Sequence, residues 1–310
     1  MKISFTILLI FALCGGVLPG QSALTPLEEF ESLRQENKFV VKAQEYSDAK
    51  KYVNAAEQYR RAAKSTTNSE KRAGYLFREA ENLLLGKKSH RAKKVYFELI
   101  NNYRFFIPLN TVLEQMRELA DYFEHGKGTL LPFADPGTAI EIYREIVKCL
   151  PGGEQSLNDR LVLGKKLEAD GQPEEAVKLY QETIKLLPRN PDVRLALAMC
   201  LAKLAAKSDG DGEISRAAIR EAQTFLDLAA PNDPRREVVA EIHTKANNDE
   251  ADRLLKRAQF YLVKYHYRPE VARRYLLDVV RDFPTSPAAP IAQAQLDEHF
   301  PEAVSDKSDN

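Results

Sequence analysis

A short pattern of small and large side chains recurs along this 310-residue chain and constrains its fold more than any other feature. A small residue is followed four positions later by an aromatic or aliphatic residue, and three positions after that by a third residue, usually apolar or small. The pattern occurs at Ala55/Tyr59/Ala62, Ala92/Tyr96/Leu99, Ala139/Tyr143/Ile146, Ala176/Tyr180/Thr183 and Ala272/Leu276/Val279. These spacings place the members on one stripe of an α-helix, where the small residue lets a neighbouring helix approach. The recurrence predicts a stack of helical repeats.

A further small residue precedes each stripe and completes a unit of two helices. Ala43, for example, lies twelve positions ahead of Ala55. The same interval separates Ala80 from Ala92 and Gly164 from Ala176, whereas inserts or extra turn residues lengthen it after Ala120, Ala198 and Ala258. Paired small residues at this spacing resemble the tetratricopeptide repeat, whose unit is two antiparallel helices. The resemblance covers about residues 36–300.

The fold implied by this resemblance is all-α, a tetratricopeptide-type right-handed superhelix of about six helix pairs. Residues 288–300 predict a lone C-terminal capping helix that covers the last apolar face, with Ile291, Ala294 and Gln295 on one side. Stacked repeats of this kind present a concave surface to another macromolecule and seldom catalyse a reaction.

The N-terminus has the three-part build of a secretory signal peptide. Lys2 supplies positive charge, an apolar run covers residues 3–13, and small residues precede Ala23. The run is too short to span a bilayer comfortably, so we expect export with cleavage; an uncleaved anchor is the alternative. The predicted organisation is a signal peptide over 1–22, a lead-in over 23–35, the superhelix over 36–300 and a disordered tail over 301–310.

The sequence contains three cysteines, one in the N-terminal segment and two in the predicted superhelix. Cys14 ends the apolar run, where a bacterial lipoprotein carries its lipid, but Leu13 stands where the lipoprotein peptidase requires a small residue. Lipidation of Cys14 is therefore the alternative to cleavage before Ala23. Cys149 and Cys200 should be separated by one whole helix pair, which predicts two separate core thiols and no disulfide.

Two inserts, over residues 126–137 and 207–215, interrupt the repeat. The first carries the apolar residues Leu130, Leu131 and Phe133, and we expect it to fold back on the helices. Contact of this loop with a partner is the alternative.

The second insert resembles the middle of a calcium-binding loop at Asp209 and Asp211. Lys207 and Ala218 occupy the positions of two strong ligands, however. We interpret the insert as an acidic turn and predict no metal site.

The sequence contains none of the compact catalytic motifs. It has no His-Glu-x-x-His, no Gly-x-Ser-x-Gly and no phosphate-binding loop, and its five histidines are scattered. The 45 basic residues equal the 45 acidic residues, so no general positive field indicates nucleic acid. We predict no enzyme activity and no cofactor, with protein or peptide partners. A hydrolase carried on a helical repeat remains the alternative, because catalytic groups can lie far apart in sequence.

The candidate binding residues are those of the first helices that face the inside of the superhelix and take no part in packing. They are Val40, Gln44, Ser47, Phe77, Glu81, Leu84, Arg117, Asp121, Glu124, Leu161, Lys165 and Glu168. The surface is apolar in its N-terminal part and charged in its centre, which suits an extended or helical peptide with apolar anchors beside charges.

The last full unit carries a narrower resemblance. Residues 254–296 end a helix with Phe283-Pro284-Thr285-Ser286 and continue with small residues. This is similar to the BamD family of outer-membrane assembly lipoproteins and related envelope proteins. The resemblance implies a scaffold in the periplasm or at the outer membrane whose partner is a β-barrel insertase or an unfolded outer-membrane protein. Membrane contact would be peripheral, or through a lipid on Cys14. An adaptor in cell-wall or division machinery is the alternative.

Overall fold

The computed structural model describes residues 26–126, 134–150, 152–207 and 212–301. Over these ranges the chain forms thirteen α-helices and two short 3-10 helices, without a strand. It divides into two compact units, Met1–Leu109 and Asn110–Asn310, and each is described by itself. The predicted signal peptide with Cys14, most of the apolar insert and the tail from residue 302 lie outside the described residues.

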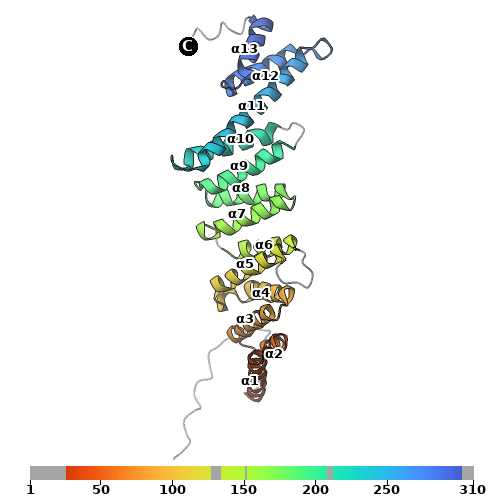
Figure 1. The fold of residues 1–310 in the computed structure, drawn as a ribbon, viewed down its shortest axis with the longest axis vertical. Coiled ribbons are helices and arrows are strands. Elements are labelled where there is room, and N and C mark those ends of the chain that lie inside the picture. Colours follow the sequence, from red (N-terminus) through yellow and green to blue (C-terminus); the bar gives the residue numbers. More distant parts are fainter. Residues whose placement is uncertain (1–25, 127–133, 151, 208–211, 302–310) are drawn as a thin grey trace, which may run out of the picture. The chain divides into compact units, whose positions relative to one another are not determined.

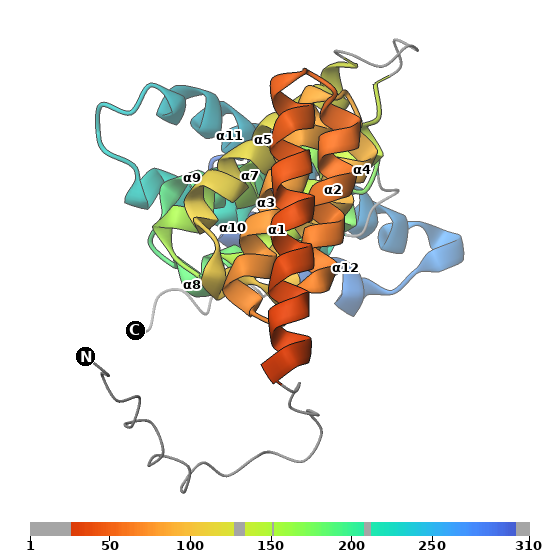
Figure 2. The same cartoon turned by 90° about the horizontal axis from the view of Figure 1, so that it is seen from below.

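The first unit consists of two helix pairs in which each helix packs against the next one along the chain. Figure 2 shows α1 and α2 running side by side. Their bounds are α1 Pro26–Asp48, α2 Tyr52–Ser65, α3 Ser69–Leu85 and α4 Ser89–Asn102, followed by η1 Arg104–Phe106. Helix α1 begins at Pro26, so most of the expected lead-in is already helical. The small residues Ala43, Ala55, Ala80 and Ala92 are fully buried, as the repeat predicts.

The second unit continues the same arrangement (Figure 1), and its chain order alternates first and second helices up to a last single helix. The bounds are α5 Leu109–His125, α6 Pro136–Cys149, α7 Glu154–Ala169, α8 Pro173–Leu186, α9 Pro191–Ala205, α10 Gly212–Leu228, α11 Arg235–Leu262, η2 Lys264–His266, α12 Pro269–Asp282 and α13 Ala288–His299. Six helix pairs and a C-terminal helix confirm the predicted all-α, tetratricopeptide-type fold, and the packing of consecutive pairs fits a superhelical repeat.

Three of the helix pairs share one turn geometry. Lys50 and Lys87 have φ of 57° and Gly171 has φ of 77°, which places all three in the left-handed region. In each turn the next residue donates a backbone hydrogen bond of 2.8 Å to the carbonyl five positions earlier, as in Lys51 N to Tyr46 O. This is the Schellman ending of a helix, which satisfies the last carbonyls and reverses the chain. These three helix pairs therefore repeat the backbone conformation of the turn as well as the packing of the helices.

The structure corrects two details of the sequence interpretation. Helix α10 begins at Gly212, so the last part of the predicted 207–215 insert is helical. A Cβ on Gly212 would lie 1.9 Å from Arg253 Nη2, because α11 passes close to the start of α10. In α13 the packed side is that of Ala292 and Leu296, whereas Ile291 is 48% exposed.

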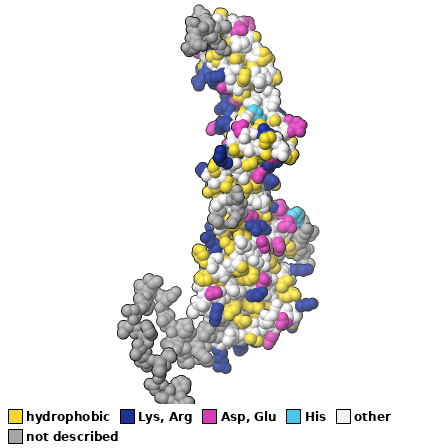
Figure 3. Space-filling model, turned by 90° about the vertical axis from the view of Figure 1, so that its left-hand side faces the viewer, with side chains coloured by type: hydrophobic (Ala, Val, Ile, Leu, Met, Phe, Trp, Pro, Cys, Tyr) yellow, Lys and Arg dark blue, Asp and Glu magenta, His cyan; other side chains and the backbone are white. Residues whose placement is uncertain are grey.

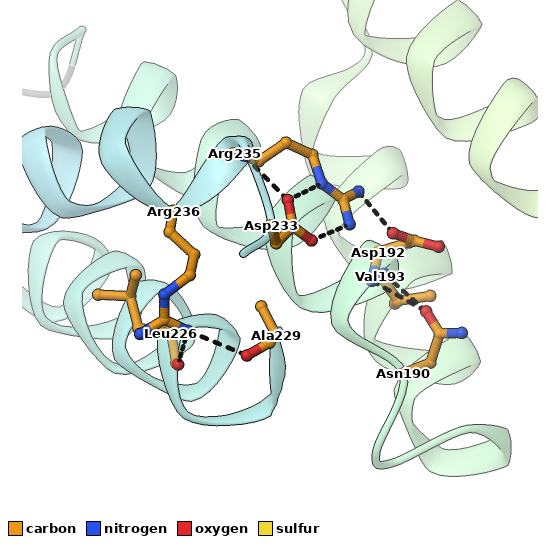
Figure 4. Close-up of polar contacts among 8 residues, drawn as sticks. All are labelled: Asn190, Asp192, Val193, Leu226, Ala229, Asp233, Arg235 and Arg236. Carbon is orange, nitrogen blue, oxygen red and sulfur yellow. Dashed lines mark hydrogen bonds and ion pairs between the residues drawn. The ribbon is translucent and has the colours of Figure 1, made fainter. Parts of the chain in front are cut away.

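The start of α11 is fixed to its neighbours by two arginines (Figure 4). Arg235 bonds Asp192 at the start of α9 at 2.6 Å and Asp233 in the preceding turn at 2.7 Å. Arg236 donates to the carbonyl of Ala229 at the end of α10 at 3.0 Å. These contacts bring the ends of three consecutive helices together. In the part of the chain that the structure describes, no helix is both long and apolar enough to cross a membrane.

Candidate functional site

A hollow of about 700 Å³ lies on the second unit, between the first helices α7 and α9. Residues of α7 and α9 form its sides, and the α7–α8 turn and the starts of α8 and α10 complete it. The lining residues are Lys165, Glu168, Ala169, Gly171, Pro173, Glu174, Tyr180, Ala196, Met199, Cys200, Lys203, Leu204, Lys207 and Ile214. We call this set the α7–α9 groove.

The floor of the α7–α9 groove is apolar and rests on the protein core. Tyr180 and Cys200 are fully buried beneath it, whereas Met199 is 38% exposed and stands in the opening. Leu204 and Ile214 are half-buried and pack against the same core cluster. Methionine is unbranched and adapts its shape, so this floor can accept differently shaped apolar side chains.

One carboxylate organises the polar side of the groove. Glu168 accepts a hydrogen bond from the Tyr180 hydroxyl at 3.0 Å and another from Lys203 Nζ at 2.9 Å. Burial and the neighbouring charge of Glu168 raise the pKa of Tyr180, which keeps the hydroxyl protonated and donating. Helices α7, α8 and α9 are thereby tied together at the base of the groove.

Positive charge dominates the rim. Lys165 and Lys207 are exposed at the two sides, and Lys203 reaches across to Glu168. Glu174 is the other acidic residue of the lining. An apolar floor below a rim of three lysines and two glutamates favours a partner that carries an acidic side chain beside an apolar one.

The thiol in the groove is unsuited to nucleophilic chemistry. Burial raises the pKa of Cys200 to about 11, and the negative charge of Glu168 acts in the same direction. The thiolate is the reactive form of cysteine, so little of it exists at neutral pH. Cys149 is likewise buried, and neither cysteine forms a disulfide, as the sequence predicts.

Two of the twelve predicted residues line the groove, namely Lys165 and Glu168. Leu161 is half-buried at the edge of the core cluster on the same helix. The prediction of a binding surface on first helices thus coincides with the hollow at α7, and the binding role itself stays a prediction.

The predicted residues of α5 are engaged with α7. Arg117 donates to both carboxylate oxygens of the buried Asp159 at 2.8 and 2.9 Å. Glu124 is ion-paired with Lys166 of α7. These two pairs join consecutive first helices, so Arg117 and Glu124 hold the stack together in addition to any contact with a partner.

Asp121 of α5 lies beside Glu124 and His125 in a cluster whose ligand atoms are within 4.8 Å of one another. Asp121 and His125 are exposed, and Glu124 already has its partner in Lys166. His125 Nδ1 lies 2.9 Å from Asp121 Oδ1, so contacts within the protein account for all three members of the cluster.

The six remaining predicted residues lie on α1 and α3 of the first unit. Gln44 is exposed and accepts a hydrogen bond of 3.4 Å from the Tyr59 hydroxyl, and Glu81 is ion-paired with Arg78 at 2.9 Å. The other four, Val40, Ser47, Phe77 and Leu84, are half-buried. They belong to a different unit from the α7–α9 groove.

The sequence-based prediction does not include Met199 and the other α9 residues of the groove, nor Lys207 in the turn after α9. A signal for them is present in the spacing: Gln44, Glu81, Asp121 and Lys165 each follow the leading small residue of their repeat by one position, and the same count from Ala198 gives Met199. The 207–215 insert interrupts the repeat that begins with Ala198, so its register is less clear than that of the earlier repeats.

Comparisons with known proteins add no family to this description. No protein-family model matches the chain, and no curated protein matches it. Among solved structures, the C-terminal part of a TPR repeat-containing protein from Cytophaga hutchinsonii is 13% identical, with 83% of this chain and 87% of that chain covered and a TM-score of 0.34. PilF of Pseudomonas aeruginosa is 15% identical, with 86% and 99% covered and a TM-score of 0.29. The TPR2AB domain of yeast Sti1 in its pHSP90 complex is 14% identical, with 87% and 99% covered and a TM-score of 0.27. Similarities this low carry no argument about function, and the fold rests on the helix order above.

Proposed function

We propose that this chain is a non-catalytic protein-binding scaffold that holds a peptide segment of its partner in the α7–α9 groove. The observation that carries the proposal is the exposed Met199 above an apolar floor, framed by Lys165, Lys203 and Lys207. The partner segment would place an apolar side chain against Met199 and an acidic side chain at the lysine rim. Several shallow contacts along the groove would supply the affinity.

The chemistry of the groove supports binding over catalysis. Its described lining contains no histidine, and its cysteine is held as a neutral thiol by burial. The Tyr180 hydroxyl donates a hydrogen bond to Glu168 beneath the floor. These groups stiffen the groove, and none is arranged as a nucleophile beside a base.

We further propose that the scaffold acts in the bacterial cell envelope, in outer-membrane protein assembly. The support is the signal-peptide pattern of residues 1–22 and the resemblance of residues 254–296, with the helix ending Phe283-Pro284-Thr285-Ser286, to the BamD family. Mass spectrometry of the mature N-terminus together with cell fractionation tests the location: cleavage before Ala23 or a lipid on Cys14 supports export, an intact Met1 in the membrane fraction indicates the uncleaved anchor, and an intact Met1 in the cytosolic fraction contradicts export. Crosslinking in intact cells tests the role, and recovery of wall enzymes alone would favour the adaptor alternative.

The binding role is tested with a displayed library of random peptides selected on the purified chain. We expect selected peptides to share an apolar residue next to an acidic residue. Met199→Arg should reduce their affinity at least tenfold, because the longer charged side chain occupies the opening, and Lys165→Glu with Lys207→Glu should do the same by reversing the rim. The matched control is Lys178→Glu with Lys185→Glu, two exposed lysines of α8 outside the groove. Equal loss in the control, or no loss in Met199→Arg, would overturn the proposal.

A further inference from the structure

A second surface, at the end of the α11–α12 hairpin, combines exposed rings with positive charge. η2 turns the chain from α11 to α12, and a backbone hydrogen bond of 2.8 Å from Arg268 N to Tyr261 O closes the turn. Tyr265 is 89% exposed, Tyr267 63% and Val263 51%. Large side chains that stand this far out of the surface next to one another are uncommon unless the surface binds something.

The same segment is strongly basic although the whole chain is neutral. Between residues 256 and 274 there are six Lys and Arg residues and one acidic residue, Glu270. The basic residues are Lys256, Arg257, Lys264, Arg268, Arg273 and Arg274. Five of the six are exposed, and Arg273 is half-buried. In Figure 3 several Lys and Arg side chains lie along one edge of the C-terminal helices, and others are spread over the rest of this face.

A shallow hollow of about 470 Å³ adjoins the tip between α11 and α12. It is lined by Arg253, Lys256, Arg257, Phe260, Tyr261 and Tyr275. Phe260 connects the hollow to the tip, because its ring stacks on that of His266 with centroids 4.2 Å apart. The rings of Tyr261 and Tyr275 are also parallel, at 6.2 Å. The hollow thus meets the turn that carries Tyr265 and Tyr267 at the contact between Phe260 and His266, and we call the hollow and the turn together the hairpin tip.

We propose that the hairpin tip binds the surface of an anionic phospholipid membrane. Tyrosine has an apolar ring and a polar hydroxyl, so Tyr265 and Tyr267 suit the headgroup region of a bilayer. Lys264 and Arg268 flank these rings and would contact lipid phosphates, while the hollow beside Phe260 would receive one headgroup. Each basic residue near such a surface contributes roughly 1 kcal/mol, which is about a fivefold gain in partitioning.

The shape of the tip favours a membrane over an acidic peptide or a single-stranded nucleic acid. Peptides and single strands bind in grooves, where side chains or bases are enclosed. Tyr265 and Tyr267 instead project from a turn, and no described element covers them. Side chains that project in this way can insert into the headgroup region of a lipid bilayer.

Sedimentation with lipid vesicles tests the proposal, using the chain from Ala23 onward, which retains every described helix. We expect binding to vesicles that contain phosphatidylglycerol, weak binding to pure phosphatidylcholine, and a decrease as salt increases. Lys264→Gln with Arg268→Gln should lower binding at least tenfold. Tyr265→Ser with Tyr267→Ser should lower it severalfold while leaving the salt dependence in place, because the rings contribute apolar contact and not charge.

Two controls separate this proposal from folding and from the groove. Lys178→Gln with Lys185→Gln removes the same charge from α8 and should leave vesicle binding unchanged. Met199→Arg should also leave it unchanged, so the membrane surface and the peptide groove can fail independently. Circular dichroism confirms that each variant remains helical. Equal binding to neutral vesicles, full binding by the Lys264/Arg268 variant, or preference for a poly-uridine or poly-glutamate competitor over vesicles would overturn the proposal.

Discussion

Gly164 of α7 lies directly against the ring of Tyr180 of α8. A Cβ built on Gly164 would be 2.3 Å from Tyr180 Cε1 and 2.4 Å from its hydroxyl oxygen. The absence of a side chain at position 164 is therefore what lets Tyr180 reach Glu168 below the α7–α9 groove. In this repeat the leading small residue, Gly164, and the aromatic residue, Tyr180, therefore pack directly against each other.

Gly164→Ala should destabilise the α7–α8 pair by about 2 kcal/mol, because the tyrosine ring has to shift out of a packed position. Gly74→Ala is the matched control: Gly74 is exposed in the middle of α3, and a Cβ there would meet nothing within 4 Å. That change should be neutral or stabilise by up to about 1 kcal/mol, since alanine favours helix. Thermal unfolding and hydrogen exchange of the two helix pairs measure both effects. A Gly164→Ala protein as stable as Gly74→Ala would contradict the close crossing.

The shared turns predict opposite effects of glycine and lysine. Lys50→Gly and Lys87→Gly should each stabilise the chain by about 0.5 kcal/mol, because glycine adopts the left-handed conformation without the cost of a Cβ. Gly171→Lys should destabilise by about 1 kcal/mol for the same reason. Denaturation midpoints check the three variants, and the same sign of change in all of them would contradict the common geometry.

The ion pairs between neighbouring helix pairs of the second unit should contribute differently to stability according to how deeply they are buried. Arg117→Ala leaves Asp159, which is 2% exposed, without its bidentate partner, so we expect a loss of about 2 kcal/mol. Arg144→Ala breaks a comparable pair with Glu175 in which both side chains are more than 40% exposed, and it should cost less than about 1 kcal/mol. Urea denaturation measures the difference. Equal losses would show that Asp159 is better solvated than the structure indicates.

The contacts of Arg235 at the start of α11 predict that the stability of the folded chain depends on pH. Hydrogen bonds from the side chain and the backbone N–H of Arg235 lower the pKa of Asp233 to about 2. The ionised carboxylate is thus favoured in the folded state. Its contribution should be fully present above the ordinary aspartate pKa of about 4 and should be lost as the pH falls toward about 2. The melting temperature of the wild-type chain should exceed that of Asp233→Asn at neutral pH, and the gap should narrow between about pH 4 and pH 2. A gap that stays constant over this range would rule out the linkage.

The repeat was predictable because its contacts are local. Small residues at fixed spacing, such as Ala43 and Ala55, identify the crossing of adjacent helices without knowledge of distant parts of the chain. Lys165 and Glu168 line the α7–α9 groove, whereas Arg117 of the same predicted set is paired with Asp159. That pairing joins residues 42 positions apart, and spacing within one unit cannot reveal it.

The long helix α11 and the packed side of α13 were harder to infer. Residues 235–262 lack the small-to-aromatic spacing over most of their length. The start of the helix is held by Arg235, which bonds the Asp192 carboxylate, and by Arg236, which bonds the backbone carbonyl of Ala229. In α13 an alanine-rich sequence offers several apolar sides, and contact with α11 and α12 selects Ala292 over Ile291. Tertiary contacts decide such cases where local pattern does not.

The methionine methyl groups offer the most direct test of the central claim that the α7–α9 groove binds a peptide. The chain has three methionines; Met116 is fully buried in α5, and Met199 stands in the groove opening. With ¹³C-methyl labelling, titration with a selected peptide should shift the Met199 signal progressively to saturation while the Met116 signal stays in place. Saturable binding of the peptide with an unmoved Met199 signal would contradict the account.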